Sequence, residues 1–392
     1  RGRGRWCSRS CSGRGIILTC SIVLALFVGA LHMLPEDASH QTFSKAKDKS
    51  VGQALKKRET VQEDVRRPRP PAVASSILNK IPSDMRASIN ASADPCTDFY
   101  EFSCGRWLER TSIPSWQSSW AKQWDGVTTD VEHKTVQALH KDPGPAGVFF
   151  RSCMDTPTIQ KLGNAPLKPW LHAVELVKDH PSFMQSLARF ALSDMTVFFG
   201  WWVDADSVDS SINSFFIAQG GITMPDRSYY LDSSKSMAKR RLAFKTMVLN
   251  IMQLAGRTRA EAVDDANNVM EVETAIAKAM KDNTAERDEH GERTSVSELQ
   301  QLVPSIDWKE WLRTLGCPDV GSGNGRHLIV KNKEFLKQVE ALIKSAGYAK
   351  IKSYLRWQAV YSFAPYLSFP FEDELVRYNN EIYGISQLPP RW

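Results

Sequence analysis

The chain has 392 residues, of which 42% are hydrophobic and 24% charged, and its formal net charge is +6. That length is sufficient for two folded domains. The positive charge is concentrated near the N-terminus. Residues 1–71 hold 14 Lys and Arg against 6 Asp and Glu, which leaves 36 and 38 in the rest of the chain. Because nucleic-acid binding needs a basic face on the folded part, nucleic acid is excluded as an expected partner.

The N-terminal 34 residues have the pattern of a membrane anchor. Residues 1–14 carry five arginines and no acid, and residues 15–34 form an almost uncharged run of 20 residues. Such a run crosses a hydrocarbon core of roughly 30 Å as a helix and exceeds the roughly 7–15-residue core of a signal peptide. We therefore predict a basic cytoplasmic tail (1–14) and an uncleaved transmembrane signal anchor (15–34). The small residues at 28–30 leave cleavage open.

This topology predicts a type II single-pass protein of the plasma membrane, with its C-terminal part extracellular; a secreted protein is the alternative. Residues 35–93 are polar and Pro-rich, with few aromatic residues to build a core, and are predicted to form a stem. The sequon Asn90-Ala91-Ser92 lies at the end of this stem. Asn90 is therefore a predicted glycosylation site.

A helix is predicted directly after the stem. Asp98, with Glu101 three residues later, has the pattern of a capping box. If this helix includes both Cys96 and Cys104, they lie about 12 Å apart along its axis, too far for a disulfide that needs Cα atoms within roughly 7 Å. These two cysteines are therefore not expected to bond to each other.

Most of the remaining chain has helical periodicity. Apolar stripes predict helices that end at Gly256 and Gly347, and another stripe runs from Val263 to Met280. Strands are predicted at 196–202, 215–218 and 327–330 from their aromatic and β-branched residues. The predicted fold class is mainly α with minor β.

The cysteines indicate the compartment of the folded part. Cys96, Cys104, Cys153 and Cys317 follow the anchor, and no CxxC motif occurs in the chain. Well-separated cysteines beyond a membrane segment favour disulfides in an oxidising compartment, with buried thiols as the alternative. The three acids Asp204, Asp206 and Asp209 lack the Gly and Glu of a calcium loop and are interpreted as a solvated turn.

Several distinctive runs follow one another along the chain. The strongest is Pro95-Cys96-Thr97-Asp98-Phe99-Tyr100 to Cys104-Gly105-Arg106-Trp107. The later runs are Phe149–Asp155, Gln219–Ile222, Tyr229–Leu231, Ala285–Asp288, Pro304–Trp308 and Pro389–Trp392. In this order, the runs resemble the ectodomain of the neprilysin and endothelin-converting-enzyme family of zinc endopeptidases, in which the first run is the opening signature. The resemblance implies that residues 94–125 begin the catalytic domain. It also implies that residues 126–392 form a helical second domain, truncated at its C-terminus, that covers the active-site cavity.

The resemblance also implies zinc bound by an HExxH helix and a downstream Glu, which makes a peptide hydrolase. None of the eight histidines is followed by Glu, so no catalytic or metal-ligating residue is predicted in this chain. We expect the zinc site to follow Trp392 in the full-length protein, and this chain alone to bind no zinc and to be inactive. By the same resemblance, Cys96, Cys104 and Cys153 pair with cysteines beyond the chain end, and the partner of Cys317 is unassigned.

The predicted function is the N-terminal part of a type II membrane zinc endopeptidase that processes extracellular peptides. The alternative is a non-catalytic cell-surface or secreted module that binds peptides on the same fold. Peptide substrates and a membrane are the expected partners, and a homodimer is left open. In neprilysin itself, a Ser-Ser pair is followed by an Arg that binds the C-terminal carboxylate of the substrate. Here Trp120 follows Ser118-Ser119 and cannot form that ion pair, which favours an endopeptidase over a preference for short peptides.

Overall fold

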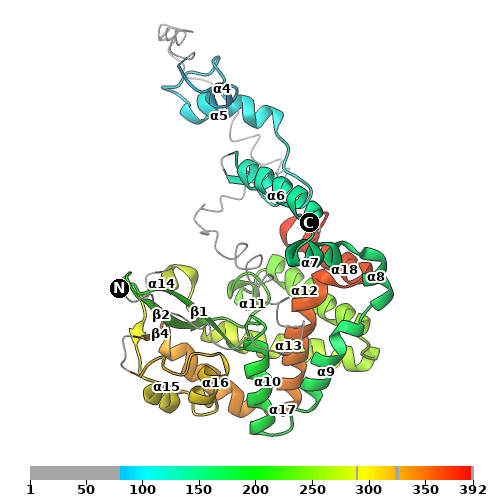
Figure 1. Ribbon diagram of the computed structural model, residues 1–392, viewed down its shortest axis with the longest axis vertical. Helices are drawn as coiled ribbons and strands as arrows, with labels where there is room; N and C mark the ends of the chain where they lie inside the picture. Colours follow the sequence, from blue (N-terminus) through cyan, green and yellow to red (C-terminus); the bar gives the residue numbers. More distant parts are fainter. Residues whose placement is uncertain (1–79, 123, 288–289, 323–325, 390–392) are drawn as a thin grey trace. The chain divides into compact units, whose positions relative to one another are not determined.

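A computed structural model describes residues 80–122, 124–287, 290–322 and 326–389. These residues are mainly helical with one four-stranded sheet, which confirms the predicted fold class (Figure 1). The predicted cytoplasmic tail, the signal anchor and residues 35–79 of the predicted stem lie outside the described residues. Within residues 80–389, as far as they are described, no helix is both long and apolar enough to span a bilayer.

The described residues form two compact units. The smaller one comprises residues 80–114 and 119–127, without residue 123, and contains α4 (Ser83–Arg86) and α5 (Phe99–Arg110). The Asp98 carboxylate accepts a hydrogen bond from the Glu101 amide at 2.8 Å, so α5 begins where the sequence predicts.

The last 14 residues of the predicted stem, 80–93, differ from expectation because they are folded against α5. The Asn90 amide donates to the Phe102 carbonyl at 2.8 Å, and the Arg106 amide donates to the Ser88 carbonyl at 3.1 Å. Ile89 is buried. These backbone hydrogen bonds and the buried Ile89 side chain hold residues 80–93 against α5, although their polar composition predicted a stem.

The larger unit comprises residues 115–118 and 128–389 as far as they are described, and α6 begins just before its second segment. Its longer helices are α6 (Trp124–Lys141), α7 (Pro145–Met154), α9 (Lys168–Glu175), α10 (His180–Ala191), α12 (Lys235–Leu254), α13 (Arg259–Ala279), α17 (Lys333–Phe363) and α18 (Phe369–Tyr383). Its short ones are α8 (Thr156–Leu162), η1 (Ala165–Leu167), α11 (Ser228–Leu231), α14 (Asn283–Arg287), α15 (Val296–Leu302), α16 (Trp308–Thr314) and η2 (Ala364–Tyr366).

Side-chain caps define where many of these helices begin. Reciprocal capping boxes start α10 at Asp179, α13 at Thr258 and α15 at Ser295. The predicted helix end at Gly256 is confirmed: α12 stops at Leu254 and Gly256 has φ +102°. At Gly347 the backbone is non-helical (φ 71°, ψ 155°), as predicted, but the chain resumes its helix at once and α17 is kinked rather than ended.

The sheet has the order β1-β2-β4-β3. The antiparallel hairpin β1 (Phe199–Ala205) and β2 (Asn213–Gln219) pairs Trp202 with Phe216. β4 (Leu328–Val330) runs parallel to β2, and β3 (Glu292–Arg293) is antiparallel to β4. The three predicted strands are therefore present, and only the two-residue β3 was not predicted.

Two apolar cores fill the larger unit. One lies between the sheet and the helices α10, α15, α16 and the first part of α17. In it, the buried rings of Trp308, Trp311 and Phe199 contact one another, the Trp311 ring edge to face with the other two and the Phe199 and Trp308 rings tilted. The other lies among α12, α13, α17 and α18, around Phe244 and Trp357 (Figure 1). Ile222, in the loop between β2 and α11, packs against both cores.

Candidate functional site

The predicted glycosylation site, Asn90, lies half-buried in the smaller unit. Its Nδ2 donates to Glu101 Oε1 at 2.7 Å, and its Oδ1 accepts from Ser92 Oγ at 2.5 Å. Glu101 therefore holds Asn90 instead of completing the predicted capping box at Asp98. Because Nδ2 carries two N–H groups, a glycan there would still leave one hydrogen to donate, and the glycosylation of Asn90 stays a prediction.

The four described cysteines occupy different environments. Cys96 is exposed just before α5, and Cys104 is half-buried within it; neither forms a disulfide among the described residues. Cys153 is half-buried in α7. Burial raises the pKa of the nearby Tyr366 phenol, and Cys153 adds a smaller effect in the same direction. Cys317 is half-buried after α16, with its Sγ 3.8 Å from the Leu315 carbonyl. The pairing of these cysteines beyond the chain end stays a prediction.

The interpretation of Asp204, Asp206 and Asp209 as a solvated turn is wrong for Asp206, which is buried in the β1–β2 hairpin. Its carboxylate accepts from Ser214 Oγ at 2.6 Å, from the Val208 amide at 2.9 Å and from Arg293 at 3.2 Å. The Ser214 hydrogen bond is the main cause that lowers the Asp206 pKa far below its usual value. This acid closes the hairpin turn and binds β3 to it.

The described residues do not fit a zinc site. They contain no group of three or more His, Cys, Asp or Glu side chains that could hold a metal ion. Chemistry by a bound metal is therefore not assigned to any residue of this segment.

The most unusual polar cluster surrounds Glu273, near the middle of α13. The carboxylate is fully buried and accepts from Thr223 Oγ1 at 2.7 Å, from the Thr223 amide at 3.0 Å and from Tyr230 OH at 2.5 Å. Gln358 Nε2 donates to it at 3.3 Å. All of these partners are neutral donors, so the charge of an ionised Glu273 has no cation against it in this cluster.

Burial is the largest influence on the pKa of Glu273. It raises the pKa to about 7, although the hydrogen bonds from Tyr230 and Thr223 act in the opposite direction. The neighbouring Tyr230 has its pKa raised by burial and by the Glu273 charge, so it stays a neutral phenol. Glu273 is therefore a buried carboxyl that exchanges its proton near neutral pH. Such groups are often found at functional positions.

A second buried acid on α13, Asp265, is paired with arginines. Arg356 Nη1 lies 2.6 Å from Asp265 Oδ1, and Arg257 Nε lies 3.0 Å from Oδ2. Arg356 also contacts Glu175 at the end of α9, as does Lys352 at 2.8 Å. Partial burial favours a neutral Glu175, but hydrogen bonds from Lys352 and Arg356 outweigh it and lower the pKa to about 2. This ion cluster connects α9, α13 and α17.

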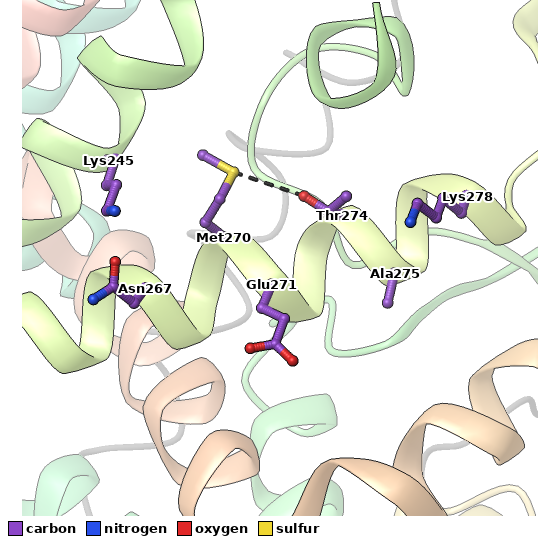
Figure 2. A pocket seen from close by; sticks show the side chains of 7 residues that line it. All are labelled: Lys245, Asn267, Met270, Glu271, Thr274, Ala275 and Lys278. Carbon is purple, nitrogen blue, oxygen red and sulfur yellow. Dashed lines mark hydrogen bonds between the residues drawn. The ribbon is translucent and has the colours of Figure 1, made fainter. Parts of the chain in front are cut away.

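A groove of about 350 Å³ lies along the outer face of α13 (Figure 2). Within it, Thr274 Oγ1 lies 3.7 Å from Met270 Sδ, and Glu271 pairs with Lys350 outside the groove. The hydrogen-bond partner of the Thr274 hydroxyl is the Met270 thioether and not a general base, so the groove is not assigned a nucleophilic role. The groove is lined by Lys245, Asn267, Met270, Glu271, Thr274, Ala275 and Lys278.

Comparisons with known proteins agree with this fold. A model of the N-terminal part of peptidase family M13 matches residues 95–392. Endothelin-converting enzyme 1 of Cavia porcellus is 26% identical over 341 residues, which cover 82% of this chain and 45% of that protein. Endothelin-converting enzyme-like 1 of Mus musculus is 25% identical over 334 residues, 76% of this chain and 41% of that protein.

Two solved structures share the fold. The zinc metalloprotease Zmp1 of Mycobacterium tuberculosis, in complex with an inhibitor, has a TM-score of 0.67 at 24% identity and covers 78% of this chain and 48% of its own. PepO of Lactobacillus rhamnosis has a TM-score of 0.60 at 16% identity, over 73% of this chain and 46% of its own. The chain thus spans a little under half the length of the relatives it matches.

The fold and the family match define the class of protein. The described residues form a mainly helical fold with a small sheet, and residues 95–392 match the N-terminal part of a metallopeptidase family. The chain belongs to peptidase family M13, the family of neprilysin and the endothelin-converting enzymes, and the resemblance read from its motifs is confirmed. Membership implies zinc in the full-length protein.

The sequence analysis did not identify Glu273 or Asp265. Both lie on the buried face of α13, next to Ala262, Ala266 and Ile276 in the helical repeat. An acid at a position where the period demands an apolar residue is the signal that could have found them.

Proposed function

We propose that this chain is the N-terminal portion of a type II membrane zinc endopeptidase that processes extracellular peptides. The observation that supports it most is the continuous match of residues 95–392 to peptidase family M13. In this proposal, residues 94–125 begin the catalytic domain, and residues 126–392 cover the active-site cavity and restrict entry to peptides.

The catalytic residues are proposed to lie outside this chain. The sequence contains no His followed by Glu, and the described residues contain no cluster that could hold a metal. The HExxH helix and its zinc would then come from residues after Trp392. Substrate entry, and not bond cleavage, would be the contribution of the larger unit.

The proposed membrane topology depends on residues 1–34. The arginines of residues 1–14 and the apolar run 15–34 support an anchor with the folded part outside the cell. Appending reporter tags at both ends and testing their protease accessibility on intact cells addresses this directly. A protected N-terminal tag with an accessible C-terminal tag is expected, and the reverse contradicts the topology.

Zinc content and peptide cleavage test the proposed activity. The full-length protein should bind one zinc per chain and cleave an internally quenched peptide in a chelator-sensitive reaction, whereas residues 1–392 alone should do neither. A full-length protein that binds the peptide without cleaving it supports the non-catalytic alternative. Stoichiometric zinc with turnover in the 392-residue chain contradicts the division of roles.

The proposed cysteine pairing predicts a difference between the two chain lengths. Cys96 and Cys104 should react with a thiol reagent in the denatured, unreduced 392-residue chain, and should be unreactive in the longer protein. Loss of a native disulfide typically costs about 2–5 kcal/mol, so the shorter chain should also be less stable or form disulfide-linked oligomers. A 392-residue monomer without reactive thiols would show that the cysteines pair within it.

A further inference from the structure

β1 is an edge strand, because the order β1-β2-β4-β3 gives it a neighbour on one side only (Figure 1). The hydrogen bonds of β2 fix which residues of β1 face the free side. The Phe215 amide and the Ile217 carbonyl bond to the residues that flank β4, so the even-numbered residues of β2 bond toward β1. The register pairs these with the even-numbered residues of β1. The backbone groups of Trp201 and Val203 therefore point away from β2.

Only the middle of this free side is available for pairing. At its start, the Phe199 amide donates to the carbonyl two residues before it at 2.8 Å, and at its end the Ala205 amide donates to Asp204 Oδ1 at 2.7 Å. Between them, the amides and carbonyls of Trp201 and Val203 have no hydrogen-bond partner among the described residues. We call these backbone groups the open edge. β1 contains neither lysine nor proline, the residues that commonly protect an exposed edge from pairing.

The open edge is complementary to itself. When two β1 strands lie antiparallel around a two-fold axis at Trp202, Trp201 of one copy is opposite Val203 of the other. Every amide and carbonyl of both open edges then forms a hydrogen bond. An axis at Trp201 or at Val203 would instead set open groups against an end of β1 whose amide is already bonded. The hydrogen bonds therefore select the register centred on Trp202.

The side chains are compatible in this register. Trp201 of one copy and Val203 of the other lie on the same face of the joined sheet, and such aromatic and β-branched pairs are favourable across antiparallel strands. On the opposite face, the Trp202 rings of the two copies are neighbours across the axis. Asp204 lies opposite Gly200 of the other copy, so no like charges are directly paired.

Two charges beside Trp202 favour a second copy as the occupant of the open edge. Lys331 Nζ lies 6.0 Å from the centre of the Trp202 ring and forms no ion pair within the part of the chain that the structure describes. Asp204 is exposed, and its carboxylate contacts only the Ala205 amide there. In the two-fold arrangement, Asp204 of one copy is diagonal to Trp202 of the other, at a spacing of about 7–8 Å that long side chains span. The lysine of each copy then lies within reach of the acid of the other.

We propose that the open edge is a self-association surface, through which two copies pair their β1 strands antiparallel and join their sheets into one. Backbone hydrogen bonds from the open edge, the contact between the Trp202 rings and reciprocal Lys331–Asp204 pairs hold the copies together. Two short edge strands bury less than the roughly 1,200 Å² of a standard interface, so we expect a reversible dimer with a dissociation constant of about 1–100 μM. This association does not depend on the proposed peptidase activity.

Sedimentation velocity of the full-length protein, over about 0.1–200 μM, tests the proposal. The wild type should change from monomer to dimer in this range without a disulfide between copies on a non-reducing gel. Val203→Pro removes an amide of the open edge and no bond to β2, so it should weaken association by about tenfold or more. Val203→Thr keeps that amide and the β-branched shape, and should associate like the wild type. A wild type that stays monomeric, or a dimer that Val203→Pro leaves unchanged, overturns the proposal.

A charge exchange keeps the test decisive if Val203→Pro does not fold. Asp204→Lys alone and Lys331→Glu alone should each weaken dimerisation by about threefold to tenfold, because like charges then meet across the axis. The two changes combined in one chain should restore the wild-type dissociation constant. A double variant as weak as the single ones would show that these residues do not meet, and would overturn the proposal. So would a monomer that binds an extended peptide at the open edge, since the occupant would then be another chain.

Discussion

Asp265 and Glu273 lie two turns apart on the buried face of α13, yet their surroundings differ in charge. Asp265 has Arg356 at 2.6 Å and Arg257 at 3.0 Å. Glu273 accepts hydrogen bonds from the amide and the hydroxyl of Thr223, from the Tyr230 phenol and from the Gln358 side-chain amide, and all four donors are neutral. The same helix therefore holds one acid in an ion cluster and the other in a neutral cluster.

This difference shows that burial alone does not decide how an acid behaves. An opposite charge within hydrogen-bond distance compensates the loss of water, whereas neutral donors do so only in part. The ion cluster should be sensitive to loss of a partner, and its Glu175, with a pKa lowered to about 2, should stay ionised near neutrality. The Glu273 cluster should respond to pH in that range.

The largest expected effect is on the ion cluster. Arg356→Met should lower the free energy of unfolding by about 3–5 kcal/mol, because it leaves Asp265 buried with one arginine fewer and removes a partner of Glu175. Denaturant unfolding at pH 7 measures this. Arg313→Met is the control, since the Arg313–Glu310 pair is exposed on α16. Equal losses in both variants would show that burial of the pair contributes nothing.

Glu273→Gln should have a smaller effect that depends on pH. The amide would bring two N–H donors into a site lined with donors, at a cost of about 1–3 kcal/mol in acid. The folded-state pKa is raised to about 7, above an unfolded value of about 4.3, so wild-type stability is complete below the lower value and declines as pH rises through 7.

The stability difference between wild type and Glu273→Gln should therefore shrink as pH rises, by up to about 1.4 kcal/mol per pH unit in that window. Unfolding curves at pH 5.5, 6.5 and 7.5 measure it, with Glu271→Gln as the exposed control. A difference that grows with pH would mean that the neutral donors suffice to ionise Glu273 in the fold.

Asp206 offers an intermediate case, because its single cation, Arg293, is half exposed. Asp206→Ala should destabilise by about 1–3 kcal/mol at pH 7 through loss of the Ser214 and Val208 hydrogen bonds. Its folded-state pKa is lowered, so this stability is present above the unfolded pKa of about 3.9 and is lost as pH falls through the folded value. Asp204→Ala, at an exposed position, is the control; an unchanged difference at pH 3 and pH 7 would contradict this.

Local sequence signals predicted much of the fold. The Asp98 cap, the end of α12 before Gly256 and the non-helical backbone at Gly347, where a helix end was predicted, each depend on residues within one or two turns. The three predicted strands exist for the same reason, since aromatic and β-branched runs act locally. Helices and strands could be predicted from the sequence where the residues that determine them are close together along the chain.

The polar clusters could not be predicted because their partners are distant in sequence. Asp206 is bound by Arg293, 87 residues away, and Glu273 by Thr223, 50 residues before it. The folded state of residues 80–93 likewise depends on backbone bonds to α5 that composition does not reveal. An acid on an apolar stripe signals such a cluster, but tertiary structure decides whether its partners are charged.

Infrared difference spectroscopy tests the contrast between the two acids most directly. In spectra of the folded chain between pH 5.5 and 8.5, the carbonyl stretch of a buried protonated carboxyl should disappear with a midpoint near pH 7, where burial places the pKa of Glu273. The band should be absent from Glu273→Gln and present in Glu271→Gln. A wild-type spectrum without a titrating carboxyl band in this range would show that neutral donors alone keep Glu273 ionised, and would contradict the account.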